Sequence, residues 1–172
     1  MIWVVLLAAV IPLCHYFFSG VLKEKHTKVK AAFLQIEEQF KRRNNLIPDF
    51  VPLIKAPLES KSQLIAELLR LRTKAVSPVL NDDEKIAMAV RIAELINELV
   101  ADAQKLPEIA EKPKFQMLLS IHKDIDEKLQ PLGHSYNECV KLYNQAVVAF
   151  PTSLFAALLN LQERKDFPGS SV

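Results

Sequence analysis

Polar side chains interrupt an apolar stripe in the middle of a long predicted helix. Phe40 ends a run of apolar residues with the three- and four-residue spacing of a packing face, and Ile47 resumes it. Between them, Arg43 and Asn44 occupy positions where the pattern requires apolar residues. A guanidinium or amide buried without a partner costs about 1–3 kcal/mol, so both groups need hydrogen-bond partners. The stretch therefore predicts either a structural polar network or a functional face.

Arg42, Asn45 and Asp49 lie three and four residues apart, so a helix places them on one face. This spacing suits a hydrogen-bonded cluster of guanidinium, carboxylate and amide groups, although such spacing more often gives a solvated face. The alternative is a solvated face with helix-stabilising ion pairs. Pro48 lies in the same stretch and lacks a backbone donor, so we expect a kink there even if the helix continues.

A second block, late in the chain, repeats a tyrosine–asparagine pair after seven residues. It comprises Tyr136, Asn137, Val140, Tyr143 and Asn144, and is followed by Phe150 and Pro151. Seven residues are about two helical turns, so the two asparagines share one stripe beside a tyrosine seam. We hypothesise that this stripe supplies amides to Arg43 or Asp49. Phe150-Pro151 is expected to end the helix.

These two blocks resemble the motifs of the LemA family, bacterial membrane-anchored helical proteins. The first reads Arg42-Arg43-x-x-Leu46-Ile47-Pro48 followed by Val51, where the usual family pattern is Arg-Arg-small-Asp-Leu-Ile-Pro-Asn-Leu-Val. The family's acid and amide are exchanged at Asn45 and Asp49, and Ser19-Gly20 stands where most relatives carry another Tyr-Asn pair. The resemblance covers nearly the whole chain. It implies an interaction role at the inner membrane, since relatives often occur alongside membrane metalloproteases or proteins implicated in envelope stress.

The composition predicts long helices. Only three glycines occur, and residues 21–132 contain none, which argues against a β-rich fold. We expect an all-α protein, with an N-terminal transmembrane helix followed by an antiparallel bundle of about four long helices. The predicted boundaries are an anchor over residues 1–22, a helical bundle over 23–164 and a flexible tail over 165–172.

Local signals predict where these helices begin and end. The first is expected to run from about residue 3 to 55. Capping boxes at Ser60-x-x-Gln63 and Asn81-x-x-Glu84 predict the starts of the next two. Pro131 and Gly133 predict a bend or a short break in the last long helix.

Residues 1–22 contain no Asp, Glu, Lys or Arg. A helix of that length rises about 33 Å and matches a hydrocarbon core about 30 Å thick. A cleaved signal peptide lacks a basic leading region and a cleavage site here, and a lipoprotein site at Cys14 lacks the small residues that should precede it. An uncleaved single-pass anchor fits best. Four lysines and one glutamate follow it directly: Lys23, Glu24, Lys25, Lys28 and Lys30. The positive-inside bias then predicts a cytoplasmic bundle at the inner membrane.

The residue types argue against an enzyme. Charges are nearly balanced, with 22 Lys and Arg against 20 Asp and Glu, so nucleic-acid binding has no electrostatic footprint. No Glu-x-x-His pair, His-Glu-x-x-His motif, phosphate-binding glycine loop or paired-cysteine site occurs. We therefore predict no catalytic, cofactor-binding or metal-binding residue. His122 lies on the last helix's seam, where a hydrogen-bonded core histidine is the default and a pH-sensitive or ligand-binding role the alternative.

Together these patterns favour a non-enzymatic, membrane-anchored interaction or scaffold protein. Its predicted partners are the lipid bilayer, through residues 1–22, and membrane or envelope proteins that the sequence does not identify; self-association is left open. The alternative is a membrane-anchored sensor that binds a small ligand at Arg42, Arg43 and Asp49. A scaffold should present an exposed apolar or mixed patch, and a sensor a concave polar pocket.

Overall fold

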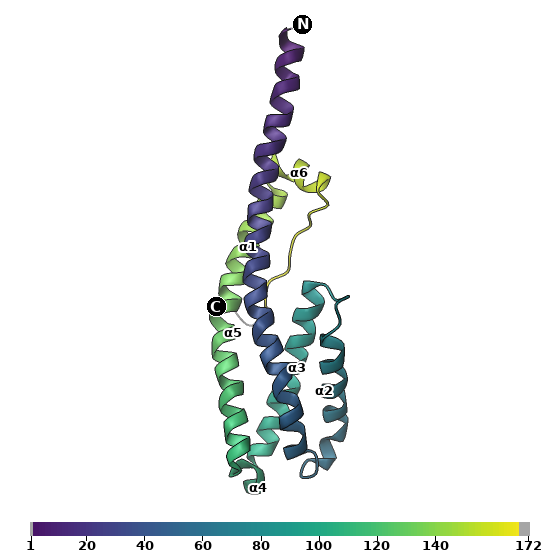
Figure 1. Ribbon diagram of the computed structural model, residues 1–172, viewed down its shortest axis with the longest axis vertical. Helices are drawn as coiled ribbons and strands as arrows, with labels where there is room; N and C mark the ends of the chain where they lie inside the picture. The colour runs from purple at the N-terminus through teal and green to yellow at the C-terminus, as the bar shows by residue number, and fades with distance from the viewer. Residues whose placement is uncertain (1, 169–172) are drawn as a thin grey trace. The chain divides into compact units, whose positions relative to one another are not determined.

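The computed structural model describes the backbone of residues 2–168 and the side chains of residues 16–168. In this part of the chain the helices are α1 (Ile2–Ile54), the 3₁₀ turn η1 (Glu59–Lys61), α2 (Ser62–Ala75), α3 (Asp82–Gln104), α4 (Pro107–Ala110), α5 (Pro113–Val148) and α6 (Thr152–Leu158) (Figure 1). No strand occurs among the described residues, and the all-α prediction is confirmed. The expected first helix is also confirmed, and it continues past Pro48.

The chain divides into two compact units. The central unit is Gln35–Leu132, and the terminal unit combines Met1–Leu34 with Gly133–Val172. The long helices α1 and α5 each contribute to both units. The bundle predicted over residues 23–164 is thus built as two bodies, which we describe separately.

Cross-helix pairs define the directions of the four main helical segments in the central unit. α1 runs antiparallel to α5, and α2 runs antiparallel to α3. The pairs between α1 and α5 are Arg43–Asp126 and Phe50–Phe115. Glu67 of α2 pairs with Arg91 of α3, and Lys61, in the turn η1 directly before α2, pairs with Glu98 of α3. α1 also meets α2 and α3: Arg72 Nε donates to the carbonyl of Asn44 at 3.2 Å, and Lys85 pairs with Glu37 at 2.9 Å. The central unit is therefore an antiparallel four-helix bundle.

An apolar core runs through the central unit. All four helical segments contribute a side chain with 0 % of its surface exposed: Ile47, Ile54, Leu68, Leu99 and Phe115. Burying one such side chain contributes about 1.5–3 kcal/mol relative to leaving it in water. Core packing is therefore the main source of stability here, and any polar group inside it must be paired to avoid reducing that stability.

The two predicted capping boxes have different outcomes. At the start of α3, Asn81 Oδ1 accepts the N–H of Glu84 at 2.9 Å, and the Glu84 carboxylate accepts the N–H of Asn81 at 3.0 Å. That box is confirmed. The box at Ser60 is wrong, because Ser60 lies inside η1 and α2 begins at Ser62 without a side-chain cap. A 3₁₀ turn directly ahead of a helix takes the place of a capping residue there.

Of the bend or short break predicted at Pro131 and Gly133, the break is wrong, because α5 is one helix with Pro131 inside it. Proline removes the hydrogen bond to the carbonyl four residues earlier, which belongs to Glu127. Both Pro131 and Glu127 are exposed, so water can satisfy that carbonyl. The cost of the proline is therefore small enough for the helix to continue.

In the terminal unit, ring contacts join the helices. His26 and Phe33 of α1 face Tyr143 and Tyr136 of α5, with ring centroids 5.8 and 6.2 Å apart respectively. α6 is attached through Phe155, which stacks on Phe18 of α1 at 5.5 Å. This terminal unit is thus a helix pair with α6 packed on α1.

Residues 161–167, which follow α6, have no regular secondary structure, yet they are held against the terminal unit. The sequence predicts a flexible tail from Lys165. Phe167 is buried in the structure, with 8 % of its surface exposed. Residues 169–172 lie outside the described residues. We call residues 161–168 the C-terminal segment.

The predicted transmembrane anchor, residues 1–22, falls mostly on side chains that the structure does not describe. Its backbone is helical from Ile2 as part of α1. Within the part of the chain that could be assessed, no helix is both long and apolar enough to cross a bilayer.

Candidate functional site

Arg43 lies inside the central unit, with 4 % of its side chain exposed. Its guanidinium donates to Asp126 of α5, and the two form a salt bridge. Burial lowers the pKa of the Arg43 guanidinium, and the negative charge of Asp126 opposes that effect. Asp126 stays 43 % exposed, so its carboxylate remains hydrated. The sequence predicts that a buried Arg43 needs hydrogen-bond partners. Asp126 is one such partner, but Arg43 Nε is buried without a hydrogen bond.

His122 extends this network toward α3. Its Nε2 lies 2.9 Å from Asn97 Oδ1 and 3.4 Å from Asp126 Oδ2. Burial lowers the pKa of the imidazole; Asp126 raises it in part, and Arg43 lowers it further. Because the amide oxygen of Asn97 can only accept a hydrogen bond, Nε2 of His122 is the donor. The default interpretation, a hydrogen-bonded core histidine, is confirmed.

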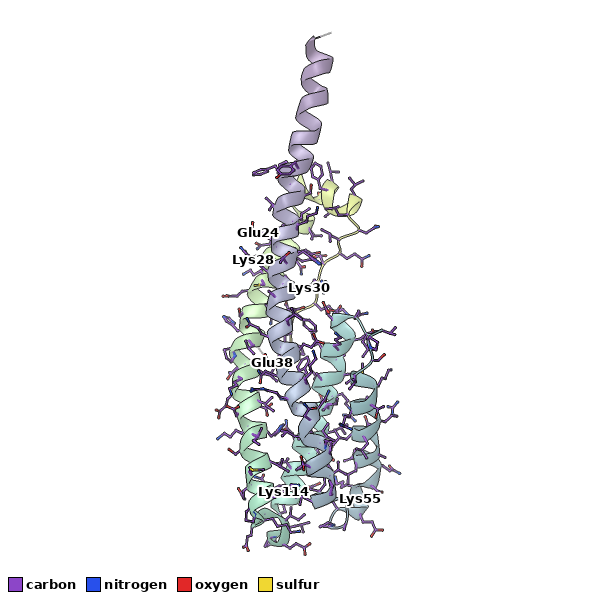
Figure 2. All side chains as sticks on the ribbon, viewed as in Figure 1. Glu24, Lys28, Lys30, Glu38, Lys55 and Lys114 are labelled. Atoms are coloured by element: carbon purple, nitrogen blue, oxygen red, sulfur yellow. The ribbon has the colours of Figure 1, made fainter. Side chains whose placement is uncertain are left out.

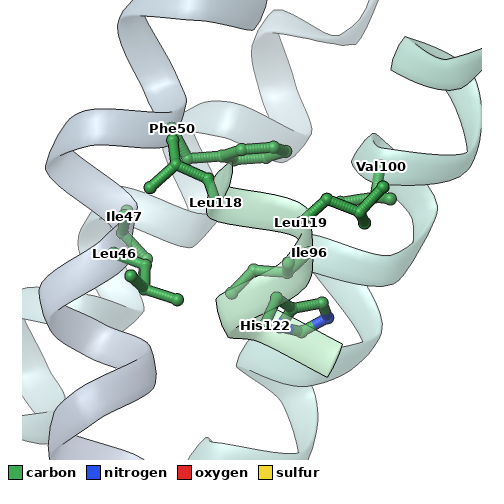
Figure 3. Close-up of a pocket in the computed structure, with 8 residues that line it drawn as sticks. All are labelled: Leu46, Ile47, Phe50, Ile96, Val100, Leu118, Leu119 and His122. Carbon is green, nitrogen blue, oxygen red and sulfur yellow. The ribbon is translucent and has the colours of Figure 1, made fainter. Parts of the chain in front are cut away.

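A small cavity lies beside the same histidine. Its volume is about 20 Å³, and Leu46, Phe50, Ile96 and Leu118 are among the side chains that line it (Figure 3). A buried water needs about two to four polar partners, and His122 is the one polar residue in this lining. The cavity is thus an apolar packing gap rather than a hydrated or ligand-binding site.

Of the two interpretations of Arg42, Asn45 and Asp49, the structure has the solvated face and not the hydrogen-bonded cluster. Arg42 is exposed and lies 3.9 Å from Glu38, one turn earlier on α1. Asp49 pairs at 2.8 Å with Lys114 of α5, which Figure 2 labels. These are the solvated, helix-stabilising pairs of the alternative interpretation, each contributing about 0–1 kcal/mol. Pro48 is also exposed.

Asn45 borders a larger cleft in the central unit. The cleft has a volume of about 480 Å³ and lies between α1 and the connection from α2 to α3. Lys41, Asn44, Ser77 and Lys85 give it polar walls. Neither this cleft nor the apolar gap beside His122 is lined by Arg42, Arg43 or Asp49. A small ligand bound in either of these two spaces would therefore contact other residues than those predicted.

In the terminal unit, both tyrosines of the second block are core residues. Tyr136 and Tyr143 are 0 % and 1 % exposed and pack on α1 through the ring contacts described above. Burial raises the pKa of the Tyr143 hydroxyl, and Arg164 lowers it in part. The tyrosines thus fix α5 against α1 and turn the following asparagine of each pair toward a neighbouring surface.

Both asparagines bind main chain. Asn137 Nδ2 donates to the carbonyl of Phe167 at 3.0 Å, and Asn137 Oδ1 accepts the N–H of the same residue at 2.6 Å. Asn144 does the same with Arg164, at 2.8 and 2.9 Å. The predicted pairing of this stripe with Arg43 or Asp49 is wrong, because every one of these groups has another partner. We call the two asparagines and their four hydrogen bonds the asparagine clamp.

Phe150 and Pro151 end α5 as predicted, since the helix stops at Val148. The peptide bond between them is cis. Thr152 follows, and its hydroxyl donates to the carbonyls of Ala146 at 2.6 Å and Ala149 at 2.8 Å, which connects α6 to the last turn of α5. Phe150 itself is 84 % exposed.

The sequence did not identify the groups that bind Arg43, His122 and the two clamp asparagines. Asp126 and Asn97 complete the network around Arg43, and the backbone of Arg164 and Phe167 completes the clamp. One usable signal for the clamp is Phe167, which follows five polar residues at positions 162–166. Across the described side chains, no three His, Cys, Asp or Glu residues gather as a metal site.

Comparison with known proteins agrees with the two motif blocks. The model of the LemA family matches residues 32–171, which include both blocks and the C-terminal segment. A search of curated proteins finds no match. Because the family model matches well over half of the 172 residues, the chain belongs to the LemA family.

Proposed function

We propose that this LemA-family chain is a non-enzymatic interaction protein, anchored in the bacterial inner membrane by residues 1–22, that holds partner proteins at the cytoplasmic face. The observation that carries the proposal is the asparagine clamp. The most specific polar groups of the second motif block bind polypeptide backbone, which is the chemistry of protein recognition rather than of a reaction.

The membrane part of the proposal rests on the uncharged run of residues 1–22 and on the lysines after it. Of those lysines, Lys28 is paired with Glu24 at 2.6 Å (Figure 2), which leaves the other three as the excess positive charge. Apolar side chains near the end of this run support the same placement. Tyr16, Phe17, Leu154 and Leu158 are all more than half exposed, and the contact of Phe18 with Phe155 brings α6 beside α1 at this level.

Membrane attachment is tested by extraction of membranes at alkaline pH. The wild-type chain should stay with the membrane fraction, as an integral protein does. Replacing Leu6 and Val10 by arginine places two charges in the apolar run. Each charge raises the free energy of membrane insertion by about 2.5–3.5 kcal/mol, so the double variant should move to the soluble fraction. Release of the wild-type chain by alkaline extraction would contradict an anchor.

The interaction role is tested by crosslinking in native membranes, followed by identification of the captured polypeptides. We expect defined partner polypeptides with the wild-type chain. An Arg42→Ala variant serves as a control and should capture the same polypeptides, because Arg42 is exposed on the central unit and lies outside the clamp. Failure to capture any polypeptide with the wild-type chain would contradict an interaction protein.

A second candidate function is a small-ligand sensor, favoured by the cleft of about 480 Å³ in the central unit. Lys41 and Lys85 line it, although Lys85 is paired with Glu37. A thermal-shift screen of small anions separates the two functions. A ligand-dependent rise in Tm that Lys41→Ala removes would favour the sensor over the scaffold.

A further inference from the structure

The asparagine clamp has the geometry of a peptide-recognition site. Each asparagine side chain forms one hydrogen bond to the carbonyl and one to the N–H of a single residue, Asn137 at Phe167 and Asn144 at Arg164. Because the residue numbers rise along α5 as they fall along the C-terminal segment, the two run antiparallel. This is main-chain recognition of the kind by which domains hold extended peptides.

The spacing of the clamp matches an extended chain. Asn137 and Asn144 are seven residues apart, about 10.5 Å along a helix. Arg164 and Phe167 are three residues apart, which spans about 9–10 Å in polyproline II or strand conformation. Exposure along the segment has the same period: Leu161 and Arg164 are half-buried and Phe167 is buried, while the four residues between them are exposed. The distance between the two asparagines, about two helical turns, thus matches the length of three residues of an extended chain.

The hydrogen bonds of the clamp demand little of the bound sequence. Four hydrogen bonds go to backbone atoms, which any residue except proline can supply at the two clamp positions. One side chain, Phe167, is buried as an anchor. The exposed residues Gln162, Glu163, Lys165 and Asp166 leave the sequence between these points free.

We propose that the asparagine clamp is a binding groove for an extended segment of a partner protein, and that the chain's own C-terminal segment occupies it as an internal competitor. The partner segment carries an aromatic side chain at the position of Phe167 and a backbone N–H there and three residues earlier. This inference rests on the proposed interaction function and names the chemical class of its partner.

The internal segment is suited to displacement. The four clamp hydrogen bonds hold its backbone, and its Phe167 side chain is buried. The ring contacts of Tyr136 and Tyr143 are made to Phe33 and His26 of α1, so the segment can open while these helix contacts stay in place. An occupied groove lowers the apparent affinity for a partner by the fraction of time the groove is free. Weakening the internal segment should therefore raise the affinity for an added peptide.

The experiment measures fluorescence anisotropy of a labelled peptide, Leu-Gln-Glu-Arg-Lys-Asp-Phe-Pro, with the full chain in detergent micelles. The Phe167→Ala variant, whose own segment has lost its anchor, should bind this peptide about tenfold or more tightly than the wild-type chain. Adding both Asn137→Ala and Asn144→Ala to the Phe167→Ala variant should abolish binding of the peptide. Adding Gln145→Ala, which changes an exposed residue next to the clamp, should leave binding unchanged. Circular dichroism checks that every variant keeps its helix content.

Two modified peptides test the mode of recognition. N-methylation of the phenylalanine amide removes the N–H that Asn137 accepts and should abolish binding, while N-methylation of the exposed lysine amide should not. Equal loss with both peptides would overturn main-chain recognition at the clamp. Absence of peptide binding by a folded Phe167→Ala variant would overturn the groove itself.

Light scattering of the full chain identifies the source of the bound segment. A wild-type chain that is monomeric in micelles supports a different protein as the partner. A dimer that dissociates in the Phe167→Ala variant would overturn that assignment, since the segment of a second copy would then fill the groove. Capture of partners in native membranes, combined with no peptide binding in micelles, would reject this inference while leaving the proposed function intact.

Discussion

The central and terminal units place polar side chains inside helical packing in two different ways. In the central unit, Arg43, Asp126 and His122 pair side chain to side chain across α1 and α5. In the terminal unit, Asn137 and Asn144 pair with the backbone of a segment that has no regular secondary structure. The first arrangement requires particular residues at both ends, whereas the second requires them at one end only.

This difference distinguishes a structural role from a role in binding other polypeptides. A side-chain pair between two helices in one bundle fixes one packing arrangement, and breaking it leaves a charge without its partner. A clamp on backbone atoms holds a segment whose sequence can vary, so the same groove can accept another polypeptide. On this account, the arginine block stabilises the central unit and the asparagine block provides the binding surface.

The largest expected effect is a difference in stability between alanine variants of two neighbouring arginines. Arg43→Ala removes a buried guanidinium and leaves Asp126 without its partner, and should lower the free energy of unfolding by about 2–3 kcal/mol; the partial hydration of Asp126 keeps the loss below that of a fully buried pair. Arg42→Ala, at an exposed pair with Glu38, should cost less than about 0.5 kcal/mol. Urea denaturation followed by circular dichroism gives both values. Equal losses would contradict the structural role of Arg43.

A smaller effect is expected in the terminal unit. Asn144→Ala removes both hydrogen bonds to Arg164, and should lower the free energy of local opening of the C-terminal segment by about 1–2 kcal/mol. Hydrogen exchange should then speed up at the amides of residues 161–168, with core amides of α3 unchanged. The matched control, Gln145→Ala, should leave protection of the segment as in the wild type. Faster exchange throughout both units would mean that the clamp is part of the cooperative core.

A third asparagine calibrates the comparison. Asn81 also takes part in two hydrogen bonds with groups of its own chain, but at the start of α3 inside the central unit. Asn81→Ala should therefore lower the global free energy of unfolding by about 1 kcal/mol, as loss of a helix cap does. Urea denaturation detects this change, whereas Asn144→Ala should shift the same curve less. The reverse order would contradict the division between the two units.

The smallest effect is a pH dependence in the central unit. Since the pKa of His122 is lowered in the folded chain, the unfolded chain takes up the proton first as pH falls. The stabilising contribution is therefore complete above the ordinary histidine pKa, about 6.5, and declines as pH falls through and below it. Tm should drop less between pH 7.5 and 5 in a His122→Gln variant than in the wild type. Parallel pH profiles for the two chains would show that His122 does not contribute.

Features controlled by local sequence were predictable. The length of α1, the cap at Asn81 and the burial of Arg43 follow from helical periodicity and capping, which depend on residues a few positions apart. The absence of a break at Pro131 has a physical cause, because a helix accepts a proline where its lost hydrogen bond faces water.

Long-range partners were not predictable in the same way. Asp126 is 83 residues from Arg43 in sequence, and no local signal separates it from the other acidic residues of α5. The clamp posed the same problem, since Asn137 and Asn144 bind backbone atoms that every residue has. The motif block identified the correct asparagines, but their partner depended on how the chain returns after α6.

The most direct test of this account is photo-crosslinking in native membranes from one position in each unit. A photo-reactive phenylalanine replaces Lys141, between the two clamp asparagines on α5, or Lys123, an exposed residue of the central unit. We predict partner adducts at position 141 that increase with Phe167→Ala and disappear with Asn137→Ala and Asn144→Ala combined, with no such pattern at position 123. Adducts at position 141 that do not respond to these substitutions, or partner adducts confined to position 123, would contradict the asparagine clamp as the interaction site.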